Sequence, residues 1–160
     1  MKIFSIIGWS GSGKTSLITR LIERFRTGER RVVAVKCTHA GYALQPEGKD
    51  TARFLQAGAQ EVYLMTEREL LRMTPLDSPD ALLADLEARL GPEDVVLLEG
   101  LARPGIPAIE VQDPRGGKAL KSRPENLAAV VSATKSGHDR PCFHPDDVAA
   151  ISRFMEGYHG

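Results

Sequence analysis

Residues 8–15 constrain this chain more than any other stretch, because they read Gly-Trp-Ser-Gly-Ser-Gly-Lys-Thr. They match G-x-x-x-x-G-K-[ST], the P-loop, in which glycines let backbone N–H groups converge on phosphate oxygens. A short apolar run at 2–7 precedes the loop, and apolar residues at helical spacing follow it, from Leu17 to Phe25. A P-loop needs this order of strand, loop and helix, so the sequence predicts a nucleotide-binding site.

Polar residues of the predicted loop have expected tasks. Lys14 is expected to reach the β- and γ-phosphates, and the Thr15 hydroxyl is expected to hold Mg²⁺. The N-terminus of the following helix adds partial positive charge at the same point. The alternative, a chance match in a glycine- and serine-rich turn, is disfavoured by the flanking strand and helix. The predicted nucleotide-binding residues of the loop are Trp9, Ser10, Gly11, Ser12, Gly13, Lys14, Thr15 and Ser16.

Length and composition narrow the class of protein. A chain of 160 residues fits one domain with a core of its own, so we expect a single nucleotide-binding domain over 1–160. It has 21 basic and 21 acidic residues, and this zero net charge disfavours nucleic acid as the main partner. Cys37 and Cys142 lack the spacing of a zinc knuckle or disulfide framework, which fits a cytoplasmic setting. The apolar start is unlike a signal peptide, and no run reaches membrane-spanning length.

Strand and helix patterns alternate along the chain. They predict an α/β fold, a P-loop NTPase-like three-layer sandwich with a mostly parallel sheet and helices on both faces. Thr66 and Glu69 form a capping-box pattern, which predicts a short helix at Leu70 and Leu71. Strands are expected at 2–7, 31–36, 61–65, 94–98, 108–112 and 126–132. Further helices are expected after the P-loop, at 50–56, from Ser78-Pro79 to Leu90, and at 145–158.

The run at 94–100, Asp-Val-Val-Leu-Leu-Glu-Gly, is the second informative stretch. P-loop proteins place an acidic residue on a buried strand near the nucleotide, where it supports Mg²⁺ or its water shell. Glu99 stands at the carboxyl end of this strand, and Gly100 lets the chain turn beside the phosphates. The alternative is a strand that simply ends in a charged residue. We assign Thr15 and Glu99 as metal ligands, and these two with Lys14 as the catalytic group.

Two further loops carry charged residues. The loop after the second strand lies beside the expected γ-phosphate, where such loops act as switches, although solvated surface residues are the alternative. Its candidate switch or substrate residues are Lys36, His39, Lys49 and Asp50. The loop at 113–123 could close over an anionic ligand, although a mobile solvated loop is the more common case. Its cations are Arg115, Lys118, Lys121 and Arg123.

Base recognition and a second metal site have weaker signals. Ser132, Ala133 and Thr134 follow a strand where guanine-binding proteins place a loop under the base, so a backbone N–H of Ala133 is a candidate donor to guanine O6. The acid that would read guanine N1–H and N2 is missing, because Gly137 occupies its position. A metal site at His138, Cys142 and His144 is disfavoured by irregular spacing.

Taken in order, several stretches resemble the MobB family of P-loop GTPases, the molybdopterin-guanine dinucleotide biosynthesis protein B group. A P-loop is shared by many families, but the order Lys-x-x-His, Gly-Lys-Asp and Ala-Gly-Ala between the P-loop and the Glu-Gly pair is far more specific. The resemblance runs from Met1 to about Ser132 and is looser afterwards. The matching pieces are residues 9–17, 35–39, 48–51, 57–59 and 96–100.

The resemblance implies a GTP-binding protein with Mg²⁺ and weak GTPase activity, often a homodimer. It implies an adapter beside the guanylyltransferase that joins GMP to molybdopterin, with molybdopterin itself as a further candidate ligand. Residues 10–16 would bind phosphates, Glu99 would be the Walker-B-like acid, and Lys36, His39, Lys49 and Asp50 would belong to the switch region.

The chain also departs from the family pattern. Proteins that resemble it commonly carry histidines at the positions of Cys37 and Ala40, and acids at those of Ala43 and Gln45. We therefore expect slower hydrolysis, or a loop that serves another ligand. Two other functions stay open: an adapter in which nucleotide only sets a conformation, and a small-molecule kinase with the 113–123 loop as a lid.

Overall fold

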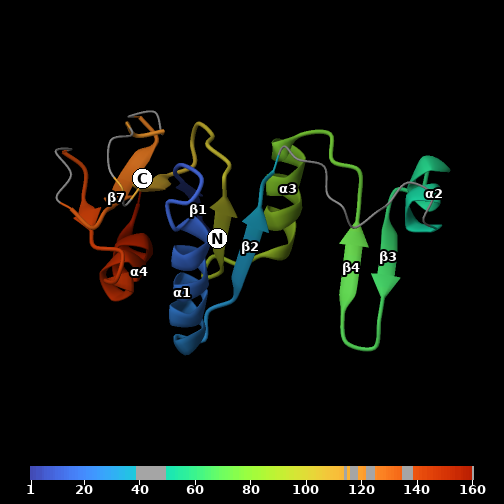
Figure 1. The fold of residues 1–160 in the computed structure, drawn as a ribbon. Coiled ribbons are helices and arrows are strands. Elements are labelled where there is room, and N and C mark those ends of the chain that lie inside the picture. Colours follow the sequence, from blue (N-terminus) through green and yellow to red (C-terminus); the bar gives the residue numbers. More distant parts are fainter. Residues whose placement is uncertain (39–49, 114, 116–118, 122–124, 135–138, 160) are drawn as a thin grey trace. The chain divides into compact units, whose positions relative to one another are not determined.

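The computed structural model describes residues 1–38, 50–113, 115, 119–121, 125–134 and 139–159 (Figure 1). They form two compact units, Met1–Thr38 with Leu90–Gly160, and His39–Arg89, each with its own sheet. The single domain expected over 1–160 stays a prediction. In the described part of the chain, no helix is both long and apolar enough to span a bilayer.

The first unit is built on a six-stranded parallel sheet, ordered β2-β5-β1-β6-β7-β8. Its first strand, β1, lies between two strands that come much later in the chain. Because all the strands are parallel, their carboxyl ends meet at one edge, where ligands of open α/β sheets bind. The strands are β1 (Lys2–Ile7), β2 (Val32–Lys36), β5 (Val95–Glu99), β6 (Ala108–Val111), β7 (Leu127–Val131) and β8 (Cys142–Phe143).

Helices α1 (Lys14–Thr27) and α4 (Val148–Gly157) cover one face of this sheet. Both contact β1 and each other, so they form a single layer (Figure 1). Alternate residues of the strands face this layer, and apolar side chains of both helices meet them in the core. The fully buried core side chains include Phe4, Ile6, Leu21, Phe25, Leu97, Ile109, Ile151 and Met155.

The predicted α/β class with a parallel sheet is confirmed, and so are five of its expected strands with small shifts at their ends. Strand β8 was not predicted, because two residues are too few for a pattern. The last helix starts at Val148, later than the expected residue 145. The Asp147 side chain caps it by accepting the N–H of Ala150 at 3.0 Å.

The second unit contains α2 (Asp50–Gln56), β3 (Val62–Met65), β4 (Leu70–Met73) and α3 (Pro79–Arg89). Both helices occur where the sequence predicts them. Strand β3 also forms, but it pairs with β4 in an antiparallel hairpin rather than joining the main sheet. An ion pair joins β4 to α3, between Arg72 Nη2 and Asp85 Oδ1 at 2.9 Å.

The short helix predicted at Leu70 and Leu71 is wrong, because these residues form strand β4. The Thr66 hydroxyl accepts the N–H of Glu69 at 3.0 Å, as in a capping box. The Thr66 N–H, however, donates to the carbonyl of Glu69 at 2.9 Å and closes a hairpin turn. The same local pattern serves both structures, and the pairing of β3 with β4 decides between them.

Candidate functional site

The loop from β1 to α1 has the conformation of an anion-binding loop. Gly13 is the N-cap of α1 with φ +98°, and it offers no side-chain cap to the first turn, which also lacks acidic residues. The N-terminal N–H groups of α1 and its dipole therefore face the loop without competition from a capping side chain. Gly8 is packed so closely against β6 that a Cβ atom would lie 2.3 Å from the carbonyl oxygen of Val111.

Lys14 and Ser12 lie inside this loop. The half-buried Lys14 folds back so that its Nζ donates to the carbonyl of Trp9 at 2.8 Å. The Ser12 hydroxyl is buried and has no hydrogen-bond partner among the described residues. A buried polar atom without a partner is expensive unless a ligand or water serves it. The loop thus presents one ammonium and one hydroxyl that suit a phosphate.

The structure brings together the two predicted metal ligands, which are 84 positions apart in sequence. Thr15 Oγ1 lies 3.1 Å from Glu99 Oε1 and 3.2 Å from Glu99 Oε2. Strand β5 is the direct neighbour of β1 and ends beside the P-loop, which is why the two side chains meet. A hydroxyl and a carboxylate are hard oxygen ligands of the kind Mg²⁺ takes together with substrate phosphates, so this donor set fits that metal.

The predicted switch residues are only partly described. Lys36 ends β2 in register with Glu99, and it is exposed. Asp50 begins α2 in the second unit, while His39 and Lys49 lie outside the described residues. Their shared role stays a prediction.

The predicted base-binding residues follow β7 at the same edge of the sheet. Ser132 is buried, and its Oγ accepts the N–H of Thr134 at 3.2 Å, whereas Ala133 and Thr134 are exposed. Gly137 lies outside the described residues. His138 of the disfavoured second metal site also lies outside the described residues, and His144 Nδ1 accepts the N–H of Asp146.

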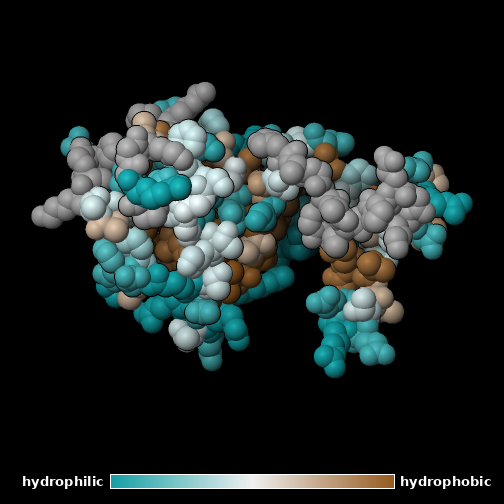
Figure 2. Space-filling model, viewed as in Figure 1, coloured by the Kyte–Doolittle hydropathy of each residue, from teal (hydrophilic) through white to brown (hydrophobic). Residues whose placement is uncertain are grey.

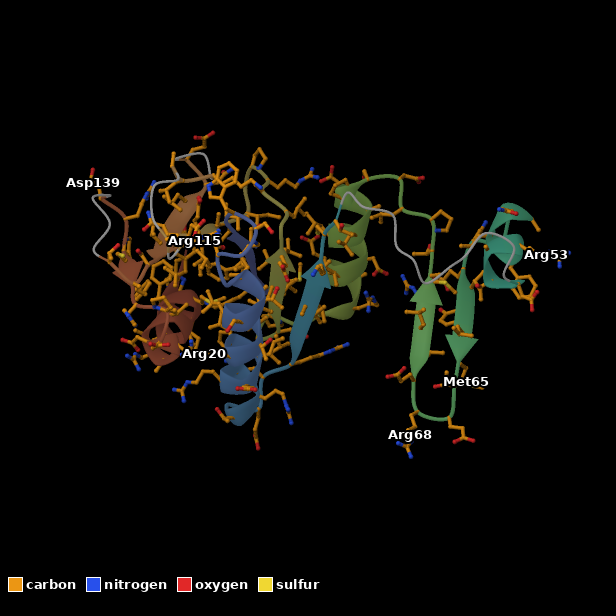
Figure 3. All side chains as sticks on the ribbon, viewed as in Figure 1. Arg20, Arg53, Met65, Arg68, Arg115 and Asp139 are labelled. Carbon is orange, nitrogen blue, oxygen red and sulfur yellow. The ribbon has the colours of Figure 1, made fainter. Side chains whose placement is uncertain are left out.

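One contact at the loop was not assigned from the sequence. Arg115, which is labelled in Figure 3, pairs with the buried Asp113 just after β6. Its Nη2 lies 3.9 Å from the point where a Cβ of Gly11 in the P-loop would stand. The sequence signal was only a basic, glycine-containing loop. Nearby, Trp9 Nε1 donates to the carbonyl of Ala119 at 2.9 Å.

Two pockets of the first unit share Lys121 in their linings. The larger one, about 240 Å³, is also lined by Arg103 and Asn126 among apolar residues. The smaller one, about 120 Å³, reaches Gly8 and Gly100. Lys121 therefore lies beside the first residue of the P-loop.

This geometry defines the class of protein. A parallel α/β sheet with a P-loop after β1, and an acid paired with it at the end of β5, is the architecture of a P-loop NTPase-like protein. The chain belongs to the family described as molybdopterin guanine dinucleotide synthesis protein B, MobB, which matches residues 3–133. The resemblance noted from the sequence is confirmed.

Known proteins similar to this chain span nearly all of it. A Haemophilus influenzae protein named molybdopterin-guanine dinucleotide biosynthesis adapter protein is 30% identical, and the match covers 98% of this chain and 88% of that protein. A Bacillus subtilis protein, named as a probable adapter of the same kind, is also 30% identical, over 99% of this chain and 94% of its own length. The crystal structure of Bacillus subtilis MobB matches with a TM-score of 0.74 and 26% identity, over 100% of this chain and 99% of that one.

Proposed function

We propose that this protein binds GTP with Mg²⁺ and acts as an adapter in molybdopterin guanine dinucleotide biosynthesis. The observation that carries the nucleotide part is the contact between Thr15 and Glu99 beside an uncapped helix N-terminus. The adapter part is supported by family membership and by the names of the relatives.

Each residue of the site has a role in this proposal. The P-loop residues 10–16, with their backbone N–H groups and the Lys14 ammonium, hold the phosphates of the nucleotide. Thr15 and Glu99 would hold Mg²⁺, which neutralises phosphate charge when it is bound. Ser132, Ala133 and Thr134 would lie under the guanine base. Because Ala43 and Gln45 replace the acids common in similar proteins, hydrolysis is slow.

The proposed partners are the guanylyltransferase that joins GMP to molybdopterin, molybdopterin itself, and a second copy of the chain in a cytoplasmic homodimer. Support for the dimer comes from the β3–β4 hairpin, whose apolar surface is visible in Figure 2. Met65 is 79% exposed and its cross-strand neighbour Leu70 is 65% exposed. A two-stranded hairpin is marginal alone, so a covering surface stabilises it.

Calorimetry with GTP and ATP tests the nucleotide part. We expect GTP to bind more tightly than ATP, and K14A to lower GTP affinity by about 100-fold, because it removes charge-assisted hydrogen bonds. R26A, which removes an exposed cation near the other end of α1, is the matched control and should bind like the wild type. Unchanged GTP affinity in K14A would contradict the proposal.

Hydrolysis tests the adapter part. Single-turnover GTP hydrolysis is measured with and without the guanylyltransferase. If the guanylyltransferase speeds GTP hydrolysis, the protein acts as a nucleotide-dependent switch. If the two proteins associate and the hydrolysis rate does not change, the protein is an adapter in which hydrolysis has no role. A chain that neither associates with the guanylyltransferase nor changes its activity is not an adapter for it.

The pocket lined by Arg103 and Lys121 favours one other function, a small-molecule kinase. Two cations in one pocket would suit an anionic acceptor. ATP-dependent phosphorylation of a pterin or sugar, without preference for GTP, would support this function. Replacement of both cations by alanine should then raise the KM for the acceptor and leave nucleotide affinity unchanged.

A further inference from the structure

The residues that follow strand β6 lie near the P-loop, on the side of β1 opposite to β5. The sheet order β5-β1-β6 places these two strands on either side of β1. The close contact of Gly8 with the carbonyl of Val111, the last residue of β6, holds the two chain segments together. Residues just after Val111 therefore have a fixed starting point beside the phosphate-binding loop.

Asp113 and Arg115 form a paired group at this point. Arg115 Nε lies 2.9 Å from Asp113 Oδ1, and Nη2 lies 2.9 Å from Oδ2. The backbone N–H of Arg115 also donates to Oδ1, at 3.1 Å. A fork of this kind fixes the plane of the guanidinium as well as its position.

The two partners differ sharply in exposure. The Asp113 side chain is 3% exposed, whereas the Arg115 side chain is 72% exposed. Burying the guanidinium as well would add its own desolvation cost, and this cost is avoided because the group stays in solvent. The buried carboxylate thus holds, through Nε and Nη2, a guanidinium on a side chain that is mostly exposed.

The held guanidinium lies over the phosphate-binding loop. Its Nη2 is 3.9 Å from the point where a Cβ of Gly11 would stand, so the guanidinium is a near neighbour of the loop at Gly11. Glu99 and Thr15 approach from the β5 side, and Arg115 approaches from the β6 side.

We propose that Arg115 contacts a phosphate of the bound nucleotide, with Asp113 as its positioning residue. This inference rests on the proposed nucleotide binding and adds a second side-chain cation to it. Because the guanidinium is already oriented, little conformational entropy is lost when it binds an anion. Lys14 then acts as a point charge inside the loop, and Arg115 as a planar donor above it.

Calorimetry with a non-hydrolysable GTP analogue and Mg²⁺ tests the role of Arg115. We expect R115A to lower affinity by about 10- to 100-fold, as for a lost charge-assisted hydrogen bond, and R115K to lower it less. The exposed Arg26, changed to alanine, is the matched control for charge and should have no effect. If the wild type binds, K14A does not, and R115A binds like the wild type, Arg115 has no such role and the P-loop function stands. If the wild type itself binds no nucleotide, the proposed function fails first.

A double-mutant cycle tests Asp113. If Asp113 acts through Arg115, D113N lowers affinity in the wild type but adds nothing in R115A. A merely structural role would add its own loss in both backgrounds and would overturn the positioning role. The double variant D113N/R115A carries no unpaired buried charge, so its melting temperature without nucleotide shows whether the loss of binding reflects misfolding.

Discussion

Glu99 is the residue at which the metal prediction is most sharply tested. E99Q keeps the size of the side chain and removes its charge, so Mg²⁺ loses its carboxylate ligand. We expect Mg²⁺ to increase GTP affinity in the wild type and to have at least about 10-fold less effect in E99Q, in calorimetry with Mg²⁺ or with chelator. E23Q, on the exposed side of α1, is the control. Equal Mg²⁺ dependence in E99Q and wild type would remove Glu99 from the metal site.

Gly8 is the residue whose backbone the site depends on. In G8A the new Cβ would stand 2.3 Å from the carbonyl oxygen of Val111, at a φ of +142°. Strain and overpacking together should lower the free energy of unfolding by at least about 2 kcal/mol, measured by urea denaturation. In G157A the new Cβ meets nothing within 4 Å, so its stability should stay unchanged or rise. Equal stability of G8A and G157A would mean that β6 can move away from the loop.

Asp85 links the elements of the second unit. Hydrogen bonds from Arg89, and then from Arg72, hold the pKa of this carboxyl below its ordinary value. The stabilisation is therefore complete above the pKa of an unfolded aspartate, near about 4, and is lost as the pH falls through the lower folded value. In hydrogen exchange, D85N should exchange faster than the wild type at residues 70–73 and 85–89 at pH 6.

The difference between D85N and the wild type should shrink as the pH falls below about 4, because the wild-type carboxyl is then protonated as well. E87Q, at an exposed position of the same helix, is the control for a lost charge. Equal exchange in D85N and the wild type at pH 6 would show that the pair with Arg72 contributes nothing.

Helices and strands with a clear hydrophobic periodicity could be predicted from the sequence. Elements whose type depends on pairing with a distant strand could not. Helix α2 was predicted with its observed bounds, Asp50–Gln56, and the strands around the P-loop were found from their apolar runs. At residues 66–71 the Thr66–Glu69 pattern is compatible with both a helix start and a hairpin turn. The pairing of β4 with β3 determines that a hairpin forms.

The site shows the same division. Thr15 and Glu99 could be brought together in advance, because Thr15 starts the helix after the P-loop at the carboxyl end of β1, and Glu99 ends the parallel neighbour β5. The pairing of Asp113 with Arg115 could not be predicted, since two residues of a loop have no periodicity, and the place of Arg115 near Gly11 follows from the pairing of β6 beside β1.

At the scale of the whole molecule, the exposed hairpin predicts self-association. The double variant M65D/L70D places two like charges at a cross-strand pair near the hairpin turn. We expect the wild type to sediment as a dimer and this variant to sediment as a monomer, because a charge buried in an apolar interface is strongly unfavourable. L76D, at an exposed leucine outside the hairpin, should stay dimeric. A wild type that is monomeric at all concentrations would contradict the proposed dimer.

The central place of β1 in its sheet has a consequence during translation. The strand and its P-loop leave the ribosome before both of its neighbouring strands, because β5 and β6 come after residue 94. In a nascent chain the glycine loop therefore lacks its neighbours in the sheet until residues 95–111 have been made. The capacity to hold a nucleotide would thus arise late and all at once, rather than in step with synthesis.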